Sequence, residues 1–388
     1  MKISNRADLE SISAAYKVQQ AIAEYRVLVC GGGGCVSSGC INTRDAVQAF
    51  ITENHLEEKA SLTFTGCMGL CSLGPLMMIE PEGALYVQVT PDMARDILAR
   101  HIIGGDIAEE YTFLDEKTKK HIPLLKDIPY FSEQVKIALR NCGKVDYASL
   151  QSSIAEGGFL ALDKALAMER KAVIEQVKLS GLRGRGGGGF PTGVKWEAGY
   201  KAEGDVKYLI CNADEGDPGA FMDRSLIESD PFGLIEGMMI GAYAIGCKNG
   251  YVYCRAEYPL AIKRLQKAID TCYERGILGQ NCMGLGFEFN LRIKQGAGAF
   301  VCGEETALMA SIEGERGMSR PRPPFPAVRG LWGKPTNINN VETFANVSYI
   351  LYNGADWFSA IGTEGTKGTK IFALTGKVKH TGLVEVPM

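Results

Sequence analysis

The sequence predicts an α/β protein with more than one domain, and three observations support this prediction. The chain has 388 residues, which is enough for two or three domains with substantial cores. Segments that read as strands alternate with segments that read as helices, first over residues 26–100 and again over residues 206–313. Glycine occurs 47 times, and much of it lies in the two runs Gly31–Gly34 and Gly184–Gly189, which indicates specialised loops and not low complexity.

The first hundred residues read as one α/β unit, and a linker follows it. Pro81-Glu82-Gly83 is typical of a turn between strands, and Pro91 stands at the start of a helix, where proline is tolerated. Residues 105–130 are polar and without a clear period, which predicts a linking segment. The predicted helices are 7–25, Thr43–Asn54 and Pro91–Arg100, and the predicted strands are Arg26–Val29, Ala60–Thr65, Leu76–Ile79 and Ala84–Val89.

After residue 130 the chain reads first as helices and then as alternating strands and helices. This alternation predicts a parallel, doubly wound sheet whose ligand-binding loops gather at the carboxyl ends of the strands. A further strand begins near Ile371. The predicted helices are Phe131–Leu139, Tyr147–Glu156, Phe159–Ala167, Met168–Leu179, Gly233–Ala244, Leu260–Tyr273 and Glu304–Glu313, and the predicted strands are Val206–Cys211, Gly250–Cys254 and Phe287–Lys294.

Composition and charge exclude several classes of protein. The formal net charge is −3 and no run of Lys and Arg occurs, which argues against a nucleic-acid-binding surface. No apolar stretch of about 18 residues occurs, and the charged N-terminus lacks the apolar core of a secretory signal. We therefore expect a cytoplasmic protein without a transmembrane segment. In that reducing compartment, the 12 cysteines favour metal ligands or small core residues over disulfides.

Four cysteines form two pairs with the spacing of metal ligands. Four residues separate Cys30 from Cys35, and three residues separate Cys67 from Cys71. Soft thiolates on two adjacent loops suit a [2Fe–2S] cluster, and the glycines of the first loop allow backbone amides to approach its sulfides. The alternatives are a structural zinc site, which usually uses a tighter Cys-x2-Cys turn, or four unrelated buried thiols. Cys40 repeats the first spacing and is either a bystander or a substitute ligand.

The stretch from Gly181 to Trp196, GLRGRGGGGFPTGVKW, has the features of a loop that binds a nucleotide. Bare backbone amides form a concave donor surface for a phosphate or for the edge of an isoalloxazine ring, and Lys195 adds a positive charge. The stretch is neither a Walker loop nor a standard dinucleotide fingerprint, because it lacks the Gly-Lys-Ser/Thr ending and follows a helical segment. Taken alone it is a moderate signal.

A polar segment, Asn212–Gly219, directly follows the predicted strand Val206–Cys211, at the end of the sheet where ligands bind. Asn212 and Asp214 can reach ribityl hydroxyls. Asp214 and Glu215 can hydrogen-bond a flavin ring or a nicotinamide amide. The alternative is a solvated acidic turn.

Two further motifs complete the pattern. Glu304 and Glu305 precede a helix, where the helix dipole stabilises carboxylates that can chelate ribose hydroxyls; the alternative is a plain capping role. Pro335–Thr343 offers amide side chains and the start of a helix, and such a turn suits a terminal phosphate.

Together these motifs resemble the NADH-binding flavoprotein (FMN) subunit of respiratory complex I and its soluble relatives, because four motifs recur in the same order. The unit with Cys30, Cys35, Cys67 and Cys71 resembles the thioredoxin-like [2Fe–2S] ferredoxin domain. The fusion of the two is most similar to the beta (diaphorase) subunit of multimeric, NAD-dependent, electron-bifurcating [FeFe]-hydrogenases, or of NAD-linked formate dehydrogenases.

The resemblance implies a fold and a domain order. We expect a thioredoxin-like [2Fe–2S] domain over residues 1–104 and a linker over residues 105–130. A Rossmann-like FMN- and NAD(H)-binding domain is expected over residues 131–345. Residues 346–388 are expected to form a connecting helix and the start of a β-grasp domain. A [4Fe–4S] cluster is expected in a C-terminal region beyond these residues.

The resemblance also implies which residues bind the cofactors, position by position. The cluster is expected on Cys30, Cys35, Cys67 and Cys71, and no catalytic side chain is expected because FMN performs the hydride transfer. Arg322 stands where Lys is common in the family, so NADP is not excluded. The residues implied for FMN are Gly184, Gly186, Gly187, Lys195, Asn212, Asp214, Glu215, Gly303, Glu304, Asn339 and Asn340, and those implied for NAD are Phe190, Asp217, Glu305, Arg322 and Phe325.

The implied function is hydride transfer between NAD(H) and FMN, with single electrons passed through iron–sulfur clusters to partner subunits. The expected partners are a hydrogenase-type catalytic subunit, a small [2Fe–2S] subunit and ferredoxin. The alternatives are the equivalent subunit of a formate dehydrogenase or of complex I, a terminal diaphorase that needs no partner, and a docking scaffold without flavin activity.

Overall fold

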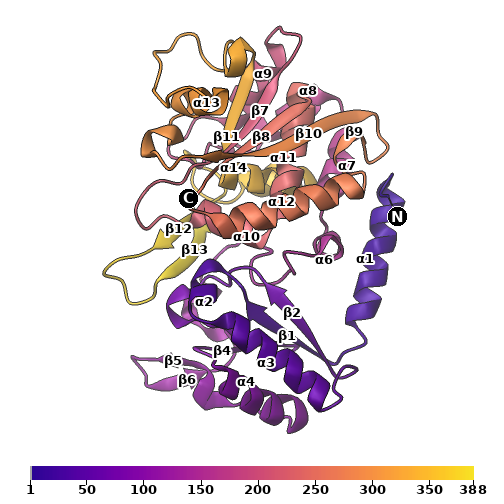
Figure 1. Cartoon of the computed structure of the whole chain (residues 1–388), viewed down its shortest axis with the longest axis vertical. Coiled ribbons are helices and arrows are strands. Elements are labelled where there is room, and N and C mark those ends of the chain that lie inside the picture. Colours follow the sequence, from indigo (N-terminus) through magenta and orange to yellow (C-terminus); the bar gives the residue numbers. More distant parts are fainter. Residues whose placement is uncertain (1) are drawn as a thin grey trace.

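The smaller of the two main sheets is built around β1 (Tyr25–Cys30), in a computed structural model that describes residues 2–388 (Figure 1). β1 pairs in parallel with β2 (Ala60–Thr65) and antiparallel with β3 (Met77–Glu80), and β4 (Ala84–Tyr86) completes the sheet at the edge beyond β3. The helices of this small domain are α2 (Gly33–Ser37), α3 (Cys40–Glu53) and α4 (Pro91–Leu98). Its hydrophobic core extends from Tyr25 to Phe131, so we call residues 21–131 the small domain.

The larger sheet has the order β11-β7-β8-β10-β9, and its first four strands are mutually parallel. This confirms the predicted parallel α/β sheet; only β9 at the edge runs antiparallel. Its strands are β7 (Tyr208–Ala213), β8 (Asn249–Arg255), β9 (Gly279–Cys282), β10 (Phe287–Gly296) and β11 (Thr336–Asn340). The helices around it are α6 (Leu150–Ala155), α7 (Leu160–Leu166), α8 (Arg170–Leu179), α9 (Thr192–Lys201), α10 (Met222–Ser229), α11 (Pro231–Ile245), α12 (Pro259–Glu274), α13 (Glu305–Glu313), α14 (Val341–Asn353) and α15 (Ala355–Ser359).

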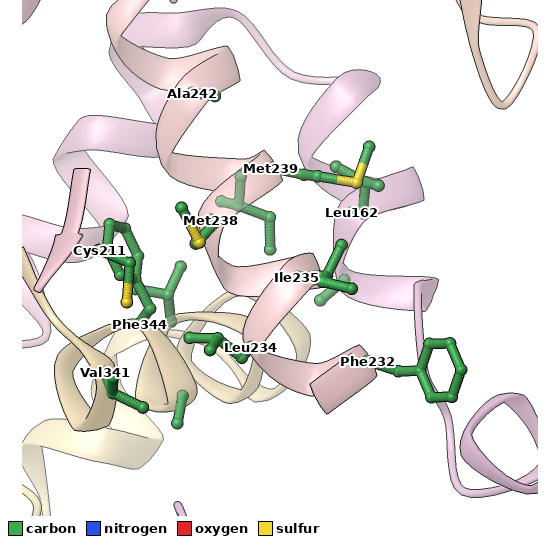
Figure 2. Close-up of a cluster of buried hydrophobic side chains, with 14 of the residues drawn as sticks. Leu162, Cys211, Phe232, Leu234, Ile235, Met238, Met239, Ala242, Val341 and Phe344 are labelled. Carbon is green, nitrogen blue, oxygen red and sulfur yellow. The ribbon is translucent and has the colours of Figure 1, made fainter. Parts of the chain in front are cut away.

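Helix α11 forms the centre of the core of this large domain (residues 132–388). Nearly all of its side chains are buried, and it packs between α7 and α14 (Figure 2). Gly237 permits the close approach, because a Cβ atom there would lie 2.2 Å from the Phe344 carbonyl oxygen of α14. A helix buried on all sides needs apolar residues all round, and Leu234, Met238 and Met239 meet that need.

Helix α1 (Arg6–Gln20) precedes the small domain in sequence but packs on the large one (Figure 1). It lies against α6, and Leu9 belongs to the hydrophobic core of the large domain. The backbone N–H of Ile3, which is also buried there, donates to the Arg275 carbonyl at 2.7 Å. The N-terminal segment therefore fastens the two domains together.

The structure differs from the predicted helix over Phe131–Leu139. Only α5 (Pro129–Ser132) is helical, and the backbone N–H groups of Ile137, Ala138 and Leu139 donate to the buried Glu385 carboxylate at 2.8–2.9 Å. Backbone donors that bind a distant side chain cannot also make the i→i−4 bonds of a helix. The helix prediction was wrong because the acceptor of these N–H groups, Glu385, lies about 250 residues away in the sequence and has no local signal.

Three other segments also differ from prediction. The presumed linker contains a hairpin of β5 (Phe113–Asp115) and β6 (Lys120–Ile122). Thr336–Asn340 is not a turn but strand β11, because it pairs with β7 in the sheet. The glycine-rich stretch runs directly into α9, whose Gly193 would place a Cβ atom 2.6 Å from the Lys178 backbone nitrogen. Close helix packing, not helix propensity, explains α9.

A second hairpin, β12 (Thr369–Leu374) and β13 (Gly382–Pro387), ends the described chain. It lies beside the small domain and beside α10 in Figure 1. Among residues 2–388, none of the helices combines the length and the apolar character needed to cross a lipid bilayer.

Glu236 carries a prediction about stability and pH. Burial raises the pKa of its carboxyl group to about 7, against the opposing effect of the Leu162 N–H that donates to it at 3.1 Å. The native state therefore holds this proton more tightly than the unfolded chain does. The resulting stabilisation is complete below the unfolded value of 4.5 and is lost as the pH rises through about 7.

We expect Glu236→Gln to remove this pH dependence. The amide keeps an oxygen acceptor for Leu162, and Glu236 borders a cavity of about 530 Å³ beneath α1 in which the new NH₂ group can be hydrated. Relative to the original chain, the variant should gain about 3 kcal/mol of unfolding free energy near pH 8 and less than about 1 kcal/mol near pH 5. Urea denaturation at both pH values measures the difference. An equal gain at both values would contradict this prediction.

Candidate flavin and iron–sulfur sites

The predicted nucleotide residues gather at the carboxyl ends of β7 and β11. Asn340 and Asn212 are direct neighbours in the parallel register of these two strands. The Asn212 Nδ2 atom donates to the Gly303 carbonyl at 2.8 Å, which brings the turn before α13 to the same edge. Three segments that are far apart in sequence thus meet where the sheet topology places a ligand.

The glycine-rich loop closes over this edge. The Gly184 N–H donates to the Phe190 carbonyl at 2.9 Å, so the loop returns on itself before α9. Gly186 lies against Asn340, and a Cβ atom there would come within 2.9 Å of the Asn340 Cβ atom. Gly187, with φ = +106°, and Gly188 face open space, since a Cβ atom on either would meet nothing within 4 Å. The loop therefore presents bare backbone to a ligand.

Lys195, Glu305 and Arg322 form a chain of charges beside the loop. The Lys195 Nζ atom lies 3.2 Å from one Glu305 carboxylate oxygen, and Arg322 Nη1 lies 2.6 Å from the other. Lys195 and Glu305 are half-buried, whereas the Arg322 side chain is 44% exposed. Glu305 thus connects a residue expected at FMN with a residue expected at NAD.

Asp214 provides the clearest sign that the site takes a ligand. Both of its carboxylate oxygens are buried, and neither has a hydrogen-bond partner among residues 2–388. Burial raises the pKa of Asp214 to about 6, and the nearby charge of Arg255 opposes that shift. Buried carboxylate oxygens normally accept hydrogen bonds, so these two acceptors call for donors from a bound molecule. The hydroxyls of a ribityl chain are such donors, and the site fits FMN.

Two of the predicted carboxylates also cap helices. Glu304 is the N-cap of α13 and accepts hydrogen bonds from the N–H groups of Thr306 and Ala307 at 2.9 and 3.0 Å. Glu215 accepts the N–H groups of Asp223 and Arg224 at the start of α10, both at 3.2 Å. These capping contacts correspond to the simpler alternative for Glu304.

The remaining predicted residues lie around this edge. The Asn339 Oδ1 atom accepts a hydrogen bond from the Trp196 indole at 2.9 Å, which fixes α9 to β11. Gly303 lies beside Asp214, with a Cβ position 3.4 Å from the Asp214 carbonyl oxygen. The aromatic rings of Phe190 and Phe325 are exposed, at 57% and 58%. Asp217 is exposed in the loop after Glu215. Their shared role at NAD stays a prediction.

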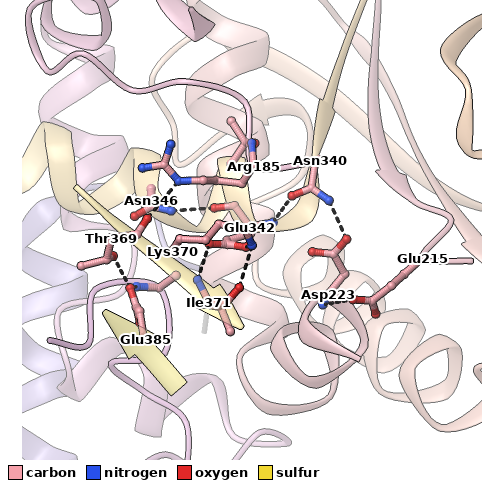
Figure 3. Close-up of polar contacts among 12 residues, drawn as sticks. Arg185, Glu215, Asp223, Asn340, Glu342, Asn346, Thr369, Lys370, Ile371 and Glu385 are labelled. Atoms are coloured by element: carbon pink, nitrogen blue, oxygen red, sulfur yellow. Dashed lines mark hydrogen bonds and ion pairs between the residues drawn. The ribbon is translucent and has the colours of Figure 1, made fainter. Parts of the chain in front are cut away.

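A buried polar network supports the site from behind, and no motif in the sequence pointed to it as a unit (Figure 3). Arg185, within the glycine run, donates to the carbonyls of Arg183, Lys367 and Thr369 at 2.6–2.9 Å. Lys370 pairs with the buried Glu342 carboxylate, which also accepts the Ile371 N–H at 2.9 Å. These contacts tie the glycine-rich loop and α14 to the hairpin of β12 and β13. An arginine in the middle of a glycine run was the one local signal available for this network.

Asp223 links the same network to α10. The Asn340 Nδ2 atom donates to its carboxylate at 2.5 Å (Figure 3). Burial, followed by the charges of Glu215 and Glu342, raises the pKa of Asp223 well above its usual range. On α10, Asp223 lies one residue from Arg224.

The four predicted ligand cysteines converge in the small domain. Cys30 ends β1, Cys35 lies in α2, and the Sγ atoms of Cys67 and Cys71 are 3.6 Å apart. Hydrogen bonding to Cys67 and burial raise the pKa of the Cys71 thiol well above its usual range, and the charge of Arg224 opposes this shift. Gly32 and Gly74 leave room at the sulfurs, since a Cβ atom at Gly74 would lie 2.6 Å from the Cys35 Sγ atom.

The donor set of four cysteine thiols fits a two-iron cluster, because each iron of a Cys₄ [2Fe–2S] cluster takes two thiolates. Within residues 2–388, no group of three or more His, Cys, Asp or Glu side chains has the arrangement of a single-ion site. Cys40 begins α3, and burial raises the pKa of its thiol to about 11 without a contribution from another cysteine.

One glycine of the run before Cys35, Gly33, differs from its predicted role. It is not part of a free loop, because it begins the short helix α2, and the Gly33 N–H donates to the Glu228 carboxylate at 3.0 Å. The Gly33 amide therefore binds the large domain and not an inorganic sulfide.

The cysteine segments dock directly on the large domain. The Cys67 N–H donates to the Ser229 hydroxyl at 2.8 Å, and Arg264 Nη2 donates to the Gly31 carbonyl at 2.7 Å. Gly66 fits so closely against α10 that a Cβ atom would lie 2.2 Å from the Ser229 Cβ atom. The backbone of Gly66 therefore packs directly against Ser229, with no room for a side chain at residue 66.

The hairpin of β12 and β13 holds the other side of the second cysteine pair. The Leu383 N–H donates to the Gly69 carbonyl at 2.7 Å, and the Ser72 N–H donates to the Thr381 carbonyl at 3.0 Å. The Tyr130 hydroxyl lies 3.0 Å from the Gly69 carbonyl oxygen. The segment Cys67–Cys71 is therefore enclosed between α10 and this hairpin.

Helix α10 connects the two sites. Its N-terminal N–H groups bind Glu215 near the carboxyl ends of β7 and β11, where the predicted FMN residues lie and which we call the flavin edge. Its last residues, Glu228 and Ser229, bind the cysteine segments. The helix has eight residues, which corresponds to a length of about 12 Å.

Comparison with known proteins agrees with both donor sets. The model of the thioredoxin-like [2Fe–2S] ferredoxin family matches residues 5–101, and the model of the Nuo51 FMN-binding domain matches residues 177–349. The chain is similar to the NADP-reducing hydrogenase subunit HndC of Solidesulfovibrio fructosivorans, with 59% identity over 66% of this chain and 52% of that protein. It is also similar to the NAD-reducing hydrogenase HoxS subunit alpha of Cupriavidus necator, with 38% identity over 94% of this chain and 59% of that protein.

A solved structure aligns with nearly the whole chain. The crystal structure of an NAD⁺-reducing [NiFe]-hydrogenase in the H₂-reduced state aligns with a TM-score of 0.55 and 28% identity, over 98% of this chain and 64% of that chain. The chain spans only between about half and two thirds of the length of these relatives. The matches confirm the family resemblance and the cofactors FMN and [2Fe–2S]. Residues 5–101 therefore belong to the thioredoxin-like [2Fe–2S] ferredoxin family, and residues 177–349 belong to the Nuo51 FMN-binding domain family.

Proposed function

We propose that the chain is the NAD(H)-reacting part of a multisubunit oxidoreductase, and that electrons pass within it between FMN and the [2Fe–2S] cluster. The observation that carries this proposal is α10, which contacts the flavin edge through Glu215 and the cysteine segments through Ser229. Because the cysteine segments dock on the same helix whose first turn contacts the flavin edge, the two sites lie at opposite ends of α10.

The residues of the flavin edge have distinct roles in this proposal. FMN, when bound, accepts a hydride from NADH and releases electrons one at a time. Asp214 accepts hydrogen bonds from the ribityl hydroxyls, and Lys195 supplies positive charge beside the glycine loop. Glu305, held by Lys195 and Arg322, binds the ribose of the dinucleotide. Phe190 and Phe325 form an exposed aromatic rim against which its rings stack.

The partners that we propose follow from the relatives. Both curated relatives carry hydrogenase subunit names, so a hydrogenase-type catalytic subunit is the proposed terminal partner. A small [2Fe–2S] subunit, ferredoxin as a second redox partner with electron bifurcation, a [4Fe–4S] cluster in the longer protein and a cytoplasmic location belong to the same proposal. One relative is named for NADP and the other for NAD. Arg322, beside the aromatic rim, is compatible with either dinucleotide.

The test uses the anaerobically purified chain, reconstituted with FMN, iron and sulfide. On mixing with NADH, we expect the flavin absorbance to bleach and the EPR signal of a reduced [2Fe–2S] cluster to follow. Replacing NADH with NADPH in a parallel experiment decides the dinucleotide. A Cys67→Ser variant is the control, since it should still bleach but lose the EPR signal. A reconstituted chain that holds no flavin would refute the proposal.

A further inference from the structure

Arg224 lies between the two cofactor sites. It is the third residue of α10, and its backbone N–H donates to Glu215 Oε2 at 3.2 Å. Its side chain points to the other site, since the guanidinium carbon lies 3.8 Å from the position of a Cβ atom on Gly33. The backbone of Arg224 thus belongs to the flavin edge and its charge belongs to the cluster.

Two aromatic faces hold this guanidinium in place. Its carbon lies 5.6 Å from the centre of the Phe221 ring and 5.5 Å from the centre of the Tyr258 ring. Cation–π contacts of this kind orient an arginine without neutralising it. The position of the charge is therefore defined by packing.

The charge of Arg224 is only partly balanced. Its nearest carboxylate is Glu228, one turn along α10, at 3.7 Å, which is an ion pair but too long for a hydrogen bond. The Glu228 carboxylate instead accepts a hydrogen bond from the Gly33 N–H. The Arg224 Nε atom is buried and has no hydrogen-bond partner among the described residues. The Arg224 guanidinium and the Glu228 carboxylate therefore both face the α2 segment that carries Cys35, without a hydrogen bond between them.

We propose that Arg224 sets the reduction potential of the [2Fe–2S] cluster, by stabilising the extra negative charge of its reduced form. This inference rests on the proposed function. One electron leaves the flavin that NADH has reduced and enters the iron pair, no bond to the protein forms or breaks, and the cluster becomes one unit more negative. A fixed cation beside an iron–sulfur cluster makes that step more favourable, because local charge is one of the determinants of cluster potential.

The experiment is an EPR-monitored redox titration of the complete chain, with both cofactors bound and dithionite as the reductant. Arg224→Gln removes the charge, and Arg224→Met removes it while keeping the apolar stem that packs on Phe221 and Tyr258. We expect each neutral variant to disfavour cluster reduction by about tenfold, which is a lowering of about 59 mV for a one-electron couple. Arg224→Lys, which keeps the charge, should retain most of the original potential.

The matched control is Arg95→Gln. Arg95 lies on α4 of the small domain, the domain that carries the cysteines, and its side chain is 41% exposed and paired with Glu53 at 2.7 Å. Its loss changes the net charge by the same amount but away from the cysteines. The reduction potential of the cluster in Arg95→Gln should equal that of the original chain.

Three outcomes would overturn the inference. They are an unchanged potential in a neutral variant that holds flavin and cluster, an equal shift in Arg224→Lys, and loss of the cluster from both neutral variants. The last outcome would make Arg224 a folding residue of the loop. An original chain that binds neither cofactor would instead refute the proposed function itself.

Discussion

A Lys195→Ala variant is expected to be purified largely without flavin. Lys195 lies on α9 beside the open glycine loop, and its Nζ atom is held at 3.2 Å from Glu305. A charged hydrogen bond from Lys195 to bound FMN would contribute about 1.5–3 kcal/mol. Removing the lysine should therefore weaken FMN binding by roughly 10- to 100-fold, since 1.4 kcal/mol corresponds to a factor of ten. The measurements are the flavin content per chain and the dissociation constant from a fluorescence titration.

The same helix offers a matched control for this variant. Lys201 is also on α9, but its side chain is 67% exposed and pairs with Glu197 at 3.0 Å. Lys201→Ala should bind FMN as the original chain does. Full flavin retention in Lys195→Ala, or equal losses in both variants, would show that Lys195 does not bind the cofactor.

The Glu385→Ala variant is expected to show the largest loss of stability. The Glu385 carboxylate is fully buried and accepts three backbone N–H groups of residues 137–139. It also accepts the Thr369 hydroxyl, as Figure 3 shows. Truncation would leave the three N–H groups buried without an acceptor. We expect the unfolding free energy to fall by about 3–5 kcal/mol, as when one partner of a buried charged contact is removed.

Urea denaturation measures this loss, and flavin content reports its effect on the site. The hairpin that carries Glu385 also supplies the Thr369 carbonyl to Arg185 in the glycine loop at 2.9 Å. Loosening of the hairpin should therefore lower flavin retention as well. Glu364→Ala, at an exposed position of the preceding segment, is the control and should have almost no effect. A loss below about 1 kcal/mol in Glu385→Ala would contradict this prediction.

The candidate site residues that the sequence indicated lie in short motifs. Cys30 with Cys35, and Cys67 with Cys71, reveal themselves by spacing alone. Asp214 follows a strand and Lys195 follows a glycine run, and both patterns have a local physical cause. The family resemblance then indicated the order of the domains, which the family models confirmed.

The residues that could not be predicted act through distant partners. Arg185 binds carbonyls of residues 367 and 369, and Glu385 binds amides of residues 137–139. Gly33 appeared to be part of a free loop, but its amide binds Glu228, 195 residues away. Local propensity contains no information about such partners.

The amino-acid sequence was therefore sufficient to identify the two cofactor chemistries and the class of fold, because the ligands and the hydrophobic periods are encoded over a few residues. Only the tertiary structure decided that the cofactor sites share one helix. The contacts of Arg224, Ser229 and Glu385 depend on which backbone and side-chain groups become buried together, and burial is a property of the packed chain. For the same reason, the α/β units that the sequence predicts as separate are joined in the structure by α10 and the terminal hairpin.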